Sequence, residues 1–427
     1  MRLRQKIIID RFIGKPLAFL LNGVVWPLGK VARINHDDSP EKVKTIAVAK
    51  LLGMGSILRA TPMVRALKQR YPSAKFIFIT TLKNRPLVES LGLMDECLCL
   101  RDTTLRFLLM DTLGLLFKLW RYRVDLYFDL EVYSALSTIL ATLSLSRNRY
   151  GFYRTSTAFR VGLNTHLVYF NDAQPISKIY MELARACGIK HIDYKIGKIQ
   201  SSPQARSDLK QWLNKHHLKE ELDYIVINPN ASDLLLERRW PSAYFVALIN
   251  ALAKDGSHPI FLVGSFSERA YVDGWREELT RQAQVMTFNA CGAFSLEMAM
   301  ALIAEARLMI TNDSGLYHIA TSFEIPVISL WGPVNPSHYA DTESDHNFIF
   351  YSKDVYCSPC VHRTDFPPCK GNNICMKSIS PKAVYAKACA ILGITAKADM
   401  SLMMDEVYAK VQSQDFDIII RTRKKRS

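Results

Sequence analysis

The chain alternates short apolar runs with helical patterns, and this alternation occurs twice. Apolar runs bounded by glycine and polar residues are typical of buried strands. Such runs lie at 44–50, 76–80 and 124–130, and again at 224–228, 259–264, 306–310 and 327–330. Helical patterns separate them, including those at 61–71, 243–254 and 267–282. The sequence therefore predicts an α/β fold of two Rossmann-like, doubly wound domains facing each other across a cleft.

The chain is long enough for two such domains. It has 427 residues, of which 49% are hydrophobic, and this can supply two ordinary cores. We expect a basic and apolar arm at 1–40, a first Rossmann-like domain at 44–205, a second at 220–395, and a helical, basic tail at 396–427.

The net charge limits the kinds of partner. It is +15, from 55 basic and 40 acidic residues, which favours nucleotides, phosphorylated glycans or an anionic membrane surface. Basic stretches interleaved with aromatic residues, zinc fingers and helix-turn-helix signatures do not occur in the sequence. Nucleic acid is therefore not an expected partner.

The N-terminal arm combines basic residues with an uncharged run at 16–29. This run has 14 residues, whereas a helix needs roughly 20 to cross a bilayer. It has no small-residue cleavage site, so a removed secretion signal is not expected. We expect a segment that lies in the membrane interface on the cytoplasmic side, with a helix packed on the first domain as the alternative. The basic residues at 421–426 could add attraction to the membrane or form a solvated end.

Polar clusters follow the strand runs, at the edge where open α/β sheets bind ligands. One contains Asp313, Ser314 and Gly315, with His318 shortly after. A helix that begins at Gly315 and is capped by Asp313 or Ser314 would offer free N–H groups and a positive dipole end, which suits a diphosphate. A plain helix cap beside a buried histidine explains the same residues.

Two other loops carry candidate residues. The loop after 224–228 contains Ser232 and Arg238, and arginine presents a planar fork of donors suited to phosphate oxygens. A solvated basic loop anchored by Trp240 is the alternative. Near the start of the chain, Gly55 and Ser56 form a turn between the first strand and the helix at 61–71, where backbone can approach a substrate.

The order of these motifs resembles glycosyltransferase family 9, the ADP-heptose:lipopolysaccharide heptosyltransferases and their relatives. The resemblance covers 44–392 and rests on the Gly55 turn with 60–62, then 128–131, 229–232 with 238–241, 262–264, 312–318 and 330–333. It implies a GT-B fold whose first domain binds mainly the acceptor and whose second binds mainly the nucleotide sugar. It also implies an inverting reaction that needs neither a metal ion nor another cofactor.

The resemblance further implies roles for individual residues. Arg238 falls where the family has a lysine that holds the donor phosphates, while Asp313, Ser314, Gly315 and His318 fall on residues that hold the sugar and diphosphate. Ser232 lies in the first donor loop, and Glu268 is a weaker match to an acidic residue near the nucleoside. Fixed donors of this kind would meet the charge that builds on a departing diphosphate.

The chain departs from the family at Ser56, where heptosyltransferases usually have an aspartate that is thought to be the base. A serine hydroxyl is too weak a base to act unaided. Glu131 or Asp129 could take the proton instead, the acceptor could be acidic enough to need little help, or the protein could bind without catalysing. The altered turn also leaves the donor sugar and its nucleoside open.

Four of the nine cysteines cluster at Cys357, Cys360, Cys369 and Cys375. They could form a structural zinc site, free thiols or a redox-labile pair, and permanent disulfides are not expected in the cytoplasm. Family members often carry cysteines at this place. The basic and aromatic region at 147–160 could receive a phosphorylated or acidic glycan, or be a solvated face.

The sequence thus predicts a cytoplasmic, membrane-associated glycosyltransferase that moves a sugar to a lipopolysaccharide or another lipid-linked surface glycan. Heptose from ADP-heptose is the first expectation. The alternative is a non-catalytic nucleotide-sugar-binding protein at the membrane, which Ser56 favours and which Arg238, Asp313 and His318 disfavour. A sugar-nucleotide epimerase is a third possibility and would need no membrane arm. The acceptor and the oligomeric state stay open.

Overall fold

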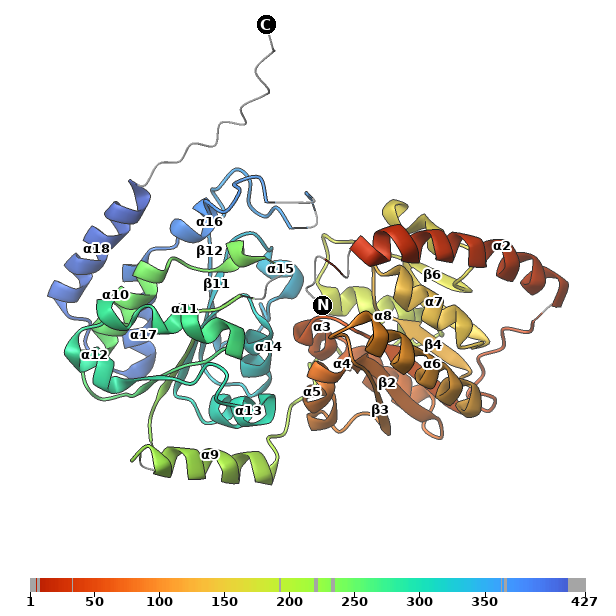
Figure 1. The fold of residues 1–427 in the computed structure, drawn as a ribbon, viewed down its shortest axis with the longest axis horizontal. Coiled ribbons are helices and arrows are strands. Elements are labelled where there is room, and N and C mark those ends of the chain that lie inside the picture. Colours follow the sequence, from red (N-terminus) through yellow and green to blue (C-terminus); the bar gives the residue numbers. More distant parts are fainter. Residues whose placement is uncertain are drawn as a thin grey trace, which may run out of the picture. The chain divides into compact units, whose positions relative to one another are not determined.

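The structure is a computed structural model that describes residues 5, 8–32, 34–191, 193–218, 222–231, 235–361, 363–364 and 367–413. The chain divides into two compact units, Met1–Gln200 and Ser201–Ser427 (Figure 1). We call them the N-terminal unit and the C-terminal unit.

The described part of the N-terminal unit contains one parallel sheet of six strands, in the order β3-β2-β1-β4-β5-β6. The strands are β1 (Thr45–Ala49), β2 (Lys75–Thr81), β3 (Glu96–Leu100), β4 (Leu126–Asp129), β5 (Asn148–Tyr153) and β6 (His166–Tyr169). The direction of the strand order reverses between β1 and β4. The loops that follow these two strands therefore meet at the topological switch point, where ligands bind in open α/β sheets.

Helices flank this sheet. They are α3 (Met54–Arg59), α4 (Thr61–Arg70), α5 (Arg85–Ser90), α6 (Leu105–Tyr122), α7 (Ala135–Leu143) and α8 (Ile176–Ala186), with 3₁₀ turns η2 (Leu82–Asn84) and η3 (Thr155–Arg160). α6 and α7 share one core with the sheet, in which Leu119 and Leu140 pack with Ile77 and Ile79. α4 packs with α8. The unit therefore has the layered arrangement that its alternating sequence pattern predicts.

The arm forms a helix attached to the N-terminal unit. A π-helical turn, η1 (Asp10–Gly14), leads into α2 (Lys15–Ala32), which packs beside α7 (Figure 1). The carboxylate of Asp10 accepts hydrogen bonds from the N–H groups of Ala135 and Leu136, at 2.9 and 2.8 Å. Together η1 and α2 form a helix of 23 residues with a mean hydropathy of 1.3, long and apolar enough to cross a membrane. The prediction that this segment is too short to span a bilayer is therefore wrong in its length, because the helix extends beyond the uncharged run at 16–29.

The described part of the C-terminal unit repeats the same topology. Its six strands lie in the order β12-β11-β10-β7-β8-β9, all parallel. They are β7 (Ile225–Asn228), β8 (Ile260–Leu262), β9 (Thr287–Asn289), β10 (Leu308–Asn312), β11 (Val327–Trp331) and β12 (Asn347–Tyr351). Numbered within each unit, both sheets have the Rossmann order 3-2-1-4-5-6, so the second switch point lies between β7 and β10.

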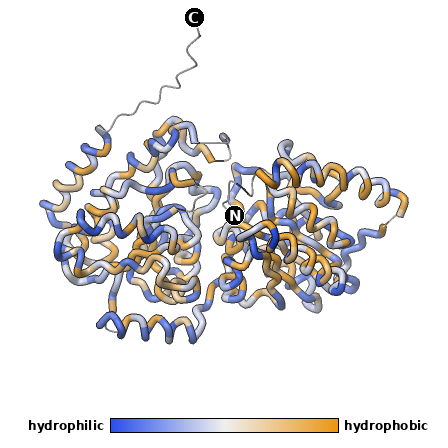
Figure 2. The backbone as a smooth tube through the Cα atoms, viewed as in Figure 1, coloured by the Kyte–Doolittle hydropathy of each residue, from blue (hydrophilic) through white to orange (hydrophobic). Residues whose placement is uncertain are grey.

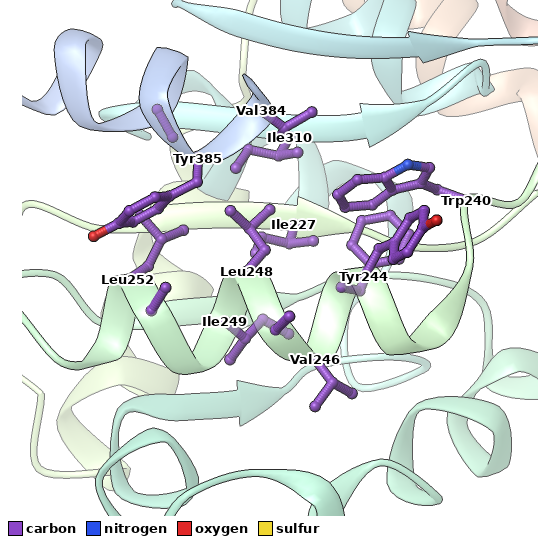
Figure 3. Close-up of a cluster of buried hydrophobic side chains, with 14 of the residues drawn as sticks. Ile227, Trp240, Tyr244, Val246, Leu248, Ile249, Leu252, Ile310, Val384 and Tyr385 are labelled. Carbon is purple, nitrogen blue, oxygen red and sulfur yellow. The ribbon is translucent and has the colours of Figure 1, made fainter. Parts of the chain in front are cut away.

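The C-terminal unit is richer in helices. They are α9 (Pro203–Lys215), α10 (Ser242–Ala253), α11 (Arg269–Asp273), α12 (Arg281–Met286), α13 (Leu296–Ala304), α14 (Gly315–Ser322), α15 (Pro336–Tyr339), α16 (Ile374–Lys377), α17 (Pro381–Leu392) and α18 (Ala398–Gln412), with 3₁₀ turns η4 (Leu236–Arg238), η5 (Phe266–Glu268) and η6 (Arg276–Glu278). In the core, Leu248 of α10 lies with Ile227 and Ile310 of the sheet and Val384 of α17 (Figure 3).

The predicted α/β fold of two doubly wound domains is confirmed, and the predicted strands are present with ends shifted by at most two residues. One helix prediction is wrong. The pattern at 267–282 is not a single helix, because the chain breaks there into η5, α11 and η6, with Gly274 following α11. α18, in the segment expected to be a tail, packs against α10 and buries Met404 and Val411. The basic residues at 421–426 lie outside the described residues.

Candidate active site

In the C-terminal unit, polar side chains tie together the loops that follow β7 and β10. Asn228 donates from Nδ2 to the hydroxyl of Ser314 at 2.8 Å. Asn312 donates from its own Nδ2 to the carbonyl of Pro229 at 2.9 Å. Both asparagines are buried. The switch point of this sheet is therefore a fixed, hydrogen-bonded edge whose loops keep their relative positions.

Ser314 caps α14, as predicted. Its hydroxyl accepts a hydrogen bond from the N–H of Tyr317, at 3.3 Å, and the helix begins at Gly315. The first N–H groups of a helix have no partner within the helix, and the helix dipole makes this end positive. His318 lies in the first turn, with 6% of its surface exposed. This helix end can therefore accept an anionic group from the sheet edge.

Arg238 lies at the end of η4 and reaches the same edge. Its Nη1 is 3.3 Å from Oδ2 of Asp313, and their side chains are 17% and 8% exposed. Burial raises the pKa of Asp313, and the neighbouring Arg238 guanidinium only partly opposes that shift. The structure thus brings together Arg238, Asp313 and Ser314, which were predicted to hold the diphosphate and the sugar.

Glu268 lies in the loop after β8, the neighbour of β7. Its Oε2 accepts hydrogen bonds from the N–H and the hydroxyl of Ser265, each at 2.7 Å. Oε1 is 3.8 Å from Nη2 of Arg239. A Cβ at Gly264 would lie 2.3 Å from Nδ2 of Asn230 and 3.1 Å from Oε2 of Glu268, so a side chain there would force Asn230 to shift. Ser232, predicted in the first donor loop, lies outside the described residues.

In the N-terminal unit, the switch point holds a buried ion pair. Lys50 follows β1 and Glu131 follows β4, and their Nζ and Oε2 atoms are 2.9 Å apart. The other oxygen of Glu131 accepts the N–H groups of Leu51 and Leu52, both at 2.8 Å. Lys50 and Glu131 are each 7% exposed. Lys50 is not among the predicted site residues, although a lysine that ends an apolar strand before a glycine turn was a usable signal.

Ser56 and Tyr180 join this pair. Tyr180 lies on α8, and burial raises its pKa, while a hydrogen bond to Ser56 and the charge of Lys50 act in the opposite direction. Ser56 and Gly55 lie in the first turn of α3, which follows Gly53 with φ at +86°. The structure therefore gathers Ser56 and Glu131 into one cluster with Lys50 and Tyr180. No local signal marked Tyr180, because it is far away in the sequence.

Asp129 is placed differently and does not suit the role of base. It is 0% exposed, and its Oδ2 is 3.3 Å from Nη1 of the fully buried Arg160. Its Oδ1 accepts the N–H of Glu131 at 3.0 Å. An acceptor hydroxyl cannot approach a carboxylate enclosed in this way.

The region at 147–160 does not form one basic surface. The guanidinium of Arg149 donates hydrogen bonds to the carbonyls of Leu163 and Ser146, each at 2.7 Å, and is therefore engaged inside the unit.

The cysteines are free thiols in the described structure. Burial, followed by the charge of neighbouring thiols, raises the pKa of Cys360 to about 11 and that of Cys375 to about 12. Among the described residues, which leave out His362 and Asp365, no group of three or more histidine, cysteine or acidic side chains could hold a metal ion.

The comparison that decides the family is a sequence match. A model of glycosyltransferase family 9 (heptosyltransferase) matches residues 118–370. The chain belongs to glycosyltransferase family 9. This confirms the resemblance to the family, and the motifs from 128–131 to 330–333 lie inside the matched residues.

Individual relatives of this family 9 protein are distant but cover most of the chain. Lipooligosaccharide heptosyltransferase 2 of Campylobacter jejuni is 22% identical over 332 residues, covering 78% of this chain and 94% of that protein. Lipopolysaccharide heptosyltransferase 2 of Salmonella typhimurium is 25% identical over 289 residues, covering 66% and 81%.

Two solved structures share the fold. The family 9 glycosyltransferase of Veillonella parvula has a TM-score of 0.69 at 19% identity, covering 84% of this chain and 99% of that one. The E. coli ADP-heptose lipopolysaccharide heptosyltransferase II has a TM-score of 0.67 at 21% identity, covering 82% and 98%. Both support the GT-B fold.

Proposed function

We propose that this family 9 protein transfers heptose from ADP-heptose to a lipopolysaccharide or another lipid-linked surface glycan, with inversion and without a metal ion. The polar edge of the C-terminal sheet carries the proposal, because Arg238, Asp313 and the start of α14 meet there. The relatives named as heptosyltransferases support heptose as the sugar.

The C-terminal unit is the proposed nucleotide-sugar domain. Arg238 and the N–H groups at Gly315 would bind the diphosphate, with His318 and Asp313 at the sugar and Glu268 near the nucleoside. Negative charge grows on the diphosphate as the bond to the sugar breaks, and preorganised donors stabilise it. A guanidinium and a helix N-terminus can do this without a divalent cation.

The N-terminal unit is the proposed acceptor domain, and Glu131 is the proposed general base. A carboxylate has about four lone-pair positions, and the described structure fills three with Lys50, Leu51 and Leu52. The remaining position on Oε2 would accept the acceptor hydroxyl, and Ser56 would help to orient it. Because these three hydrogen bonds already hold the Glu131 carboxylate, the same geometry favours the second candidate function, that of a non-catalytic nucleotide-sugar-binding protein.

We place the protein on the inner face of the cytoplasmic membrane, attached through α2. The inner side of α2 packs on α7 around Ala18, whereas Phe19 and Leu20 are 73% and 67% exposed. A helix that packs sideways on a folded unit is suited to lie in the membrane interface. Figure 2 shows the hydrophobic residues along this helix.

The test is product analysis by mass spectrometry. The full-length protein is incubated with a heptose-deficient lipopolysaccharide acceptor and ADP-heptose, or with a panel of other nucleotide sugars. We expect one added heptose, and no product from an Arg238→Ala/Asp313→Ala variant. Binding of ADP-heptose by calorimetry without transfer from any donor would favour the non-catalytic candidate, and transfer of a different sugar would overturn heptose as the donor sugar.

A further inference from the structure

A second apolar surface lies on α6, the helix between β3 and β4. Its members share one outward face and are large and exposed: Leu109 (56%), Met110 (53%), Leu113 (69%), Phe117 (65%) and Trp120 (48%). Spacings of three and four residues place them on one side of a helix. Leu115, Leu116 and Leu119 lie on a neighbouring side of the helix and pack in the core. α6 is therefore apolar on two sides, and the described part of the unit covers only one of them.

Basic side chains lie beside this outer face. By helical spacing, Lys118 and Arg121 flank the stripe on one side. At the end of the helix, a pocket of about 310 Å³ is lined by Trp120, Arg123 and Arg147, among others. Both arginines are exposed.

The same pocket contains one carboxylate and one exposed apolar side chain. Oδ2 of Asp125 already accepts two backbone N–H groups at the start of the first strand, at 2.9 and 3.1 Å. Leu145 is 76% exposed. The pocket thus combines two cations with an apolar rim, as an anionic headgroup above acyl chains requires.

We propose that the outer face of α6 docks on an anionic lipid bilayer, with acyl chains against the apolar stripe and a headgroup phosphate between Arg123 and Arg147. The charged border selects a lipid surface, because basic side chains at the interface attract anionic headgroups while the apolar stripe enters the acyl boundary. The inference adds a second contact to the proposed attachment by α2 and rests on the proposed membrane location, not on the identity of the sugar.

The positions of α2 and α6 are compatible with contact between both helices and one membrane. α7 packs with α6 on one side and with α2 on the other. The three helices therefore belong to the same side of the N-terminal unit (Figure 1). Two linked contacts raise the overall affinity, because the second binds at high effective concentration once the first has bound.

The main test is sedimentation of the full-length protein with vesicles of phosphatidylcholine, alone or mixed with phosphatidylglycerol. Leu113→Glu/Phe117→Glu should lower partitioning to the mixed vesicles at least about tenfold, because two apolar side chains lose their contact. The matched control is Val285→Glu/Leu402→Glu, which alters two side chains in the C-terminal unit that are 70% and 65% exposed. It should not change partitioning.

The charged pocket has its own variant. Arg123→Gln/Arg147→Gln should reduce the preference for phosphatidylglycerol by roughly ten- to thirtyfold, since each basic residue near the surface contributes to attraction. An unchanged preference for phosphatidylglycerol would show that Arg123 and Arg147 do not bind a headgroup.

Fluorescence quenching tests whether α6 contacts the bilayer without introducing a charged residue into that helix. In a Trp26→Phe protein, brominated phosphatidylglycerol vesicles should quench tryptophan emission, and adding Trp120→Phe should abolish that quenching. Unchanged partitioning of the glutamate variant, or no quenching that depends on Trp120, would overturn the proposal. So would light scattering that shows a dimer which Leu113→Glu/Phe117→Glu dissociates, because the face would then join two copies. These assays contain no sugar donor, so their failure is distinct from failure of the proposed transfer.

Discussion

The two units share one strand order but hold the ion pairs at their switch points differently. In the N-terminal unit, Lys50 and Glu131 are 2.9 Å apart, and two backbone N–H groups also bind the carboxylate. In the C-terminal unit, Arg238 and Asp313 are 3.3 Å apart. The Asp313 carboxylate accepts a hydrogen bond from Nη1 of Arg238, also at 3.3 Å. The first pair is therefore the closer one and is reinforced by backbone donors, whereas the second pair has the longer separation.

The pKa shifts of Lys50 and Asp313 also differ between the two pairs. Burial acts to lower the pKa of Lys50, but Glu131, Tyr180 and Asp129 outweigh it and raise the pKa above its ordinary value. Burial raises the pKa of Asp313, and Arg238 does not cancel the effect. We therefore expect an anionic ligand to be able to replace Asp313 as the partner of Arg238. This difference supports the proposal of a rigid acceptor site in the N-terminal unit and an exchangeable donor site in the C-terminal unit.

The largest expected effect is on turnover in the N-terminal unit. Glu131→Gln should lower kcat about a hundred- to ten-thousandfold, because general-base assistance is lost. The affinity for ADP-heptose should not change, since the proposed donor site lies in the C-terminal unit. Steady-state kinetics and calorimetry measure the two quantities.

The control for this prediction is Glu89→Gln, which alters a carboxylate in an exposed pair with Arg85. It should leave kcat unchanged. Ser56→Asp should partly restore turnover to the Glu131→Gln protein, because it returns a carboxylate to the family position. Normal turnover in Glu131→Gln would refute Glu131 as the base.

The second effect is on stability. Lys50→Met should lower the free energy of unfolding by about 3–5 kcal/mol, because it leaves a buried carboxylate without its cation. Denaturant unfolding followed by circular dichroism measures the loss. Lys75→Met is the control, since the Lys75 pair with Glu96 is 38% and 26% exposed and should contribute about 1 kcal/mol or less. Equal losses in both variants would contradict a special role for the buried pair.

The third effect is on donor binding. Arg238→Ala should weaken ADP-heptose binding by about 1.5–3 kcal/mol, or roughly ten- to a hundredfold, through loss of its charge-assisted contact to the diphosphate. Asp313→Ala should weaken it by a similar amount through loss of its charge-assisted contact to the sugar. Calorimetry measures the affinity. Arg307→Ala is the control, because Arg307 is exposed and precedes β10, at the opposite edge of the sheet. Unchanged affinity in both site variants, with folding intact, would remove the proposed donor site.

The sequence predicted the features that depend on neighbouring residues. The apolar runs located the strands that it named, and the Ser314 hydroxyl and Gly315 marked the start of α14 because capping acts within one turn. Lys50 and Tyr180 were not predicted as site residues because their roles depend on contacts between segments that are distant in the sequence. The outer face of α6 was also missed, since an apolar residue such as Phe117 looks the same in sequence whether it is buried or exposed.

The smallest expected effect is the dependence of stability on pH at Asp313. Because burial raises the pKa of Asp313 above its ordinary value of 3.8, the folded protein binds this proton more tightly than the unfolded chain does. Ionised Asp313 therefore reduces stability above the folded pKa, and the reduction disappears as the pH falls toward the ordinary value. Asp313→Asn resembles the protonated acid, so in the unliganded protein it should melt at a higher temperature than the wild type at neutral pH.

This advantage should shrink in mildly acidic buffer, as thermal unfolding across a pH series will show. Asp273→Asn corrects for the general effect of removing a surface charge, because Asp273 is 56% exposed in its pair with Arg269. If Asp313→Asn is instead less stable than the wild type at neutral pH, the Arg238 pair is as firmly held as the Lys50 pair. The donor site would then not be poised to exchange Asp313 for a diphosphate, and the difference between the two switch points would disappear.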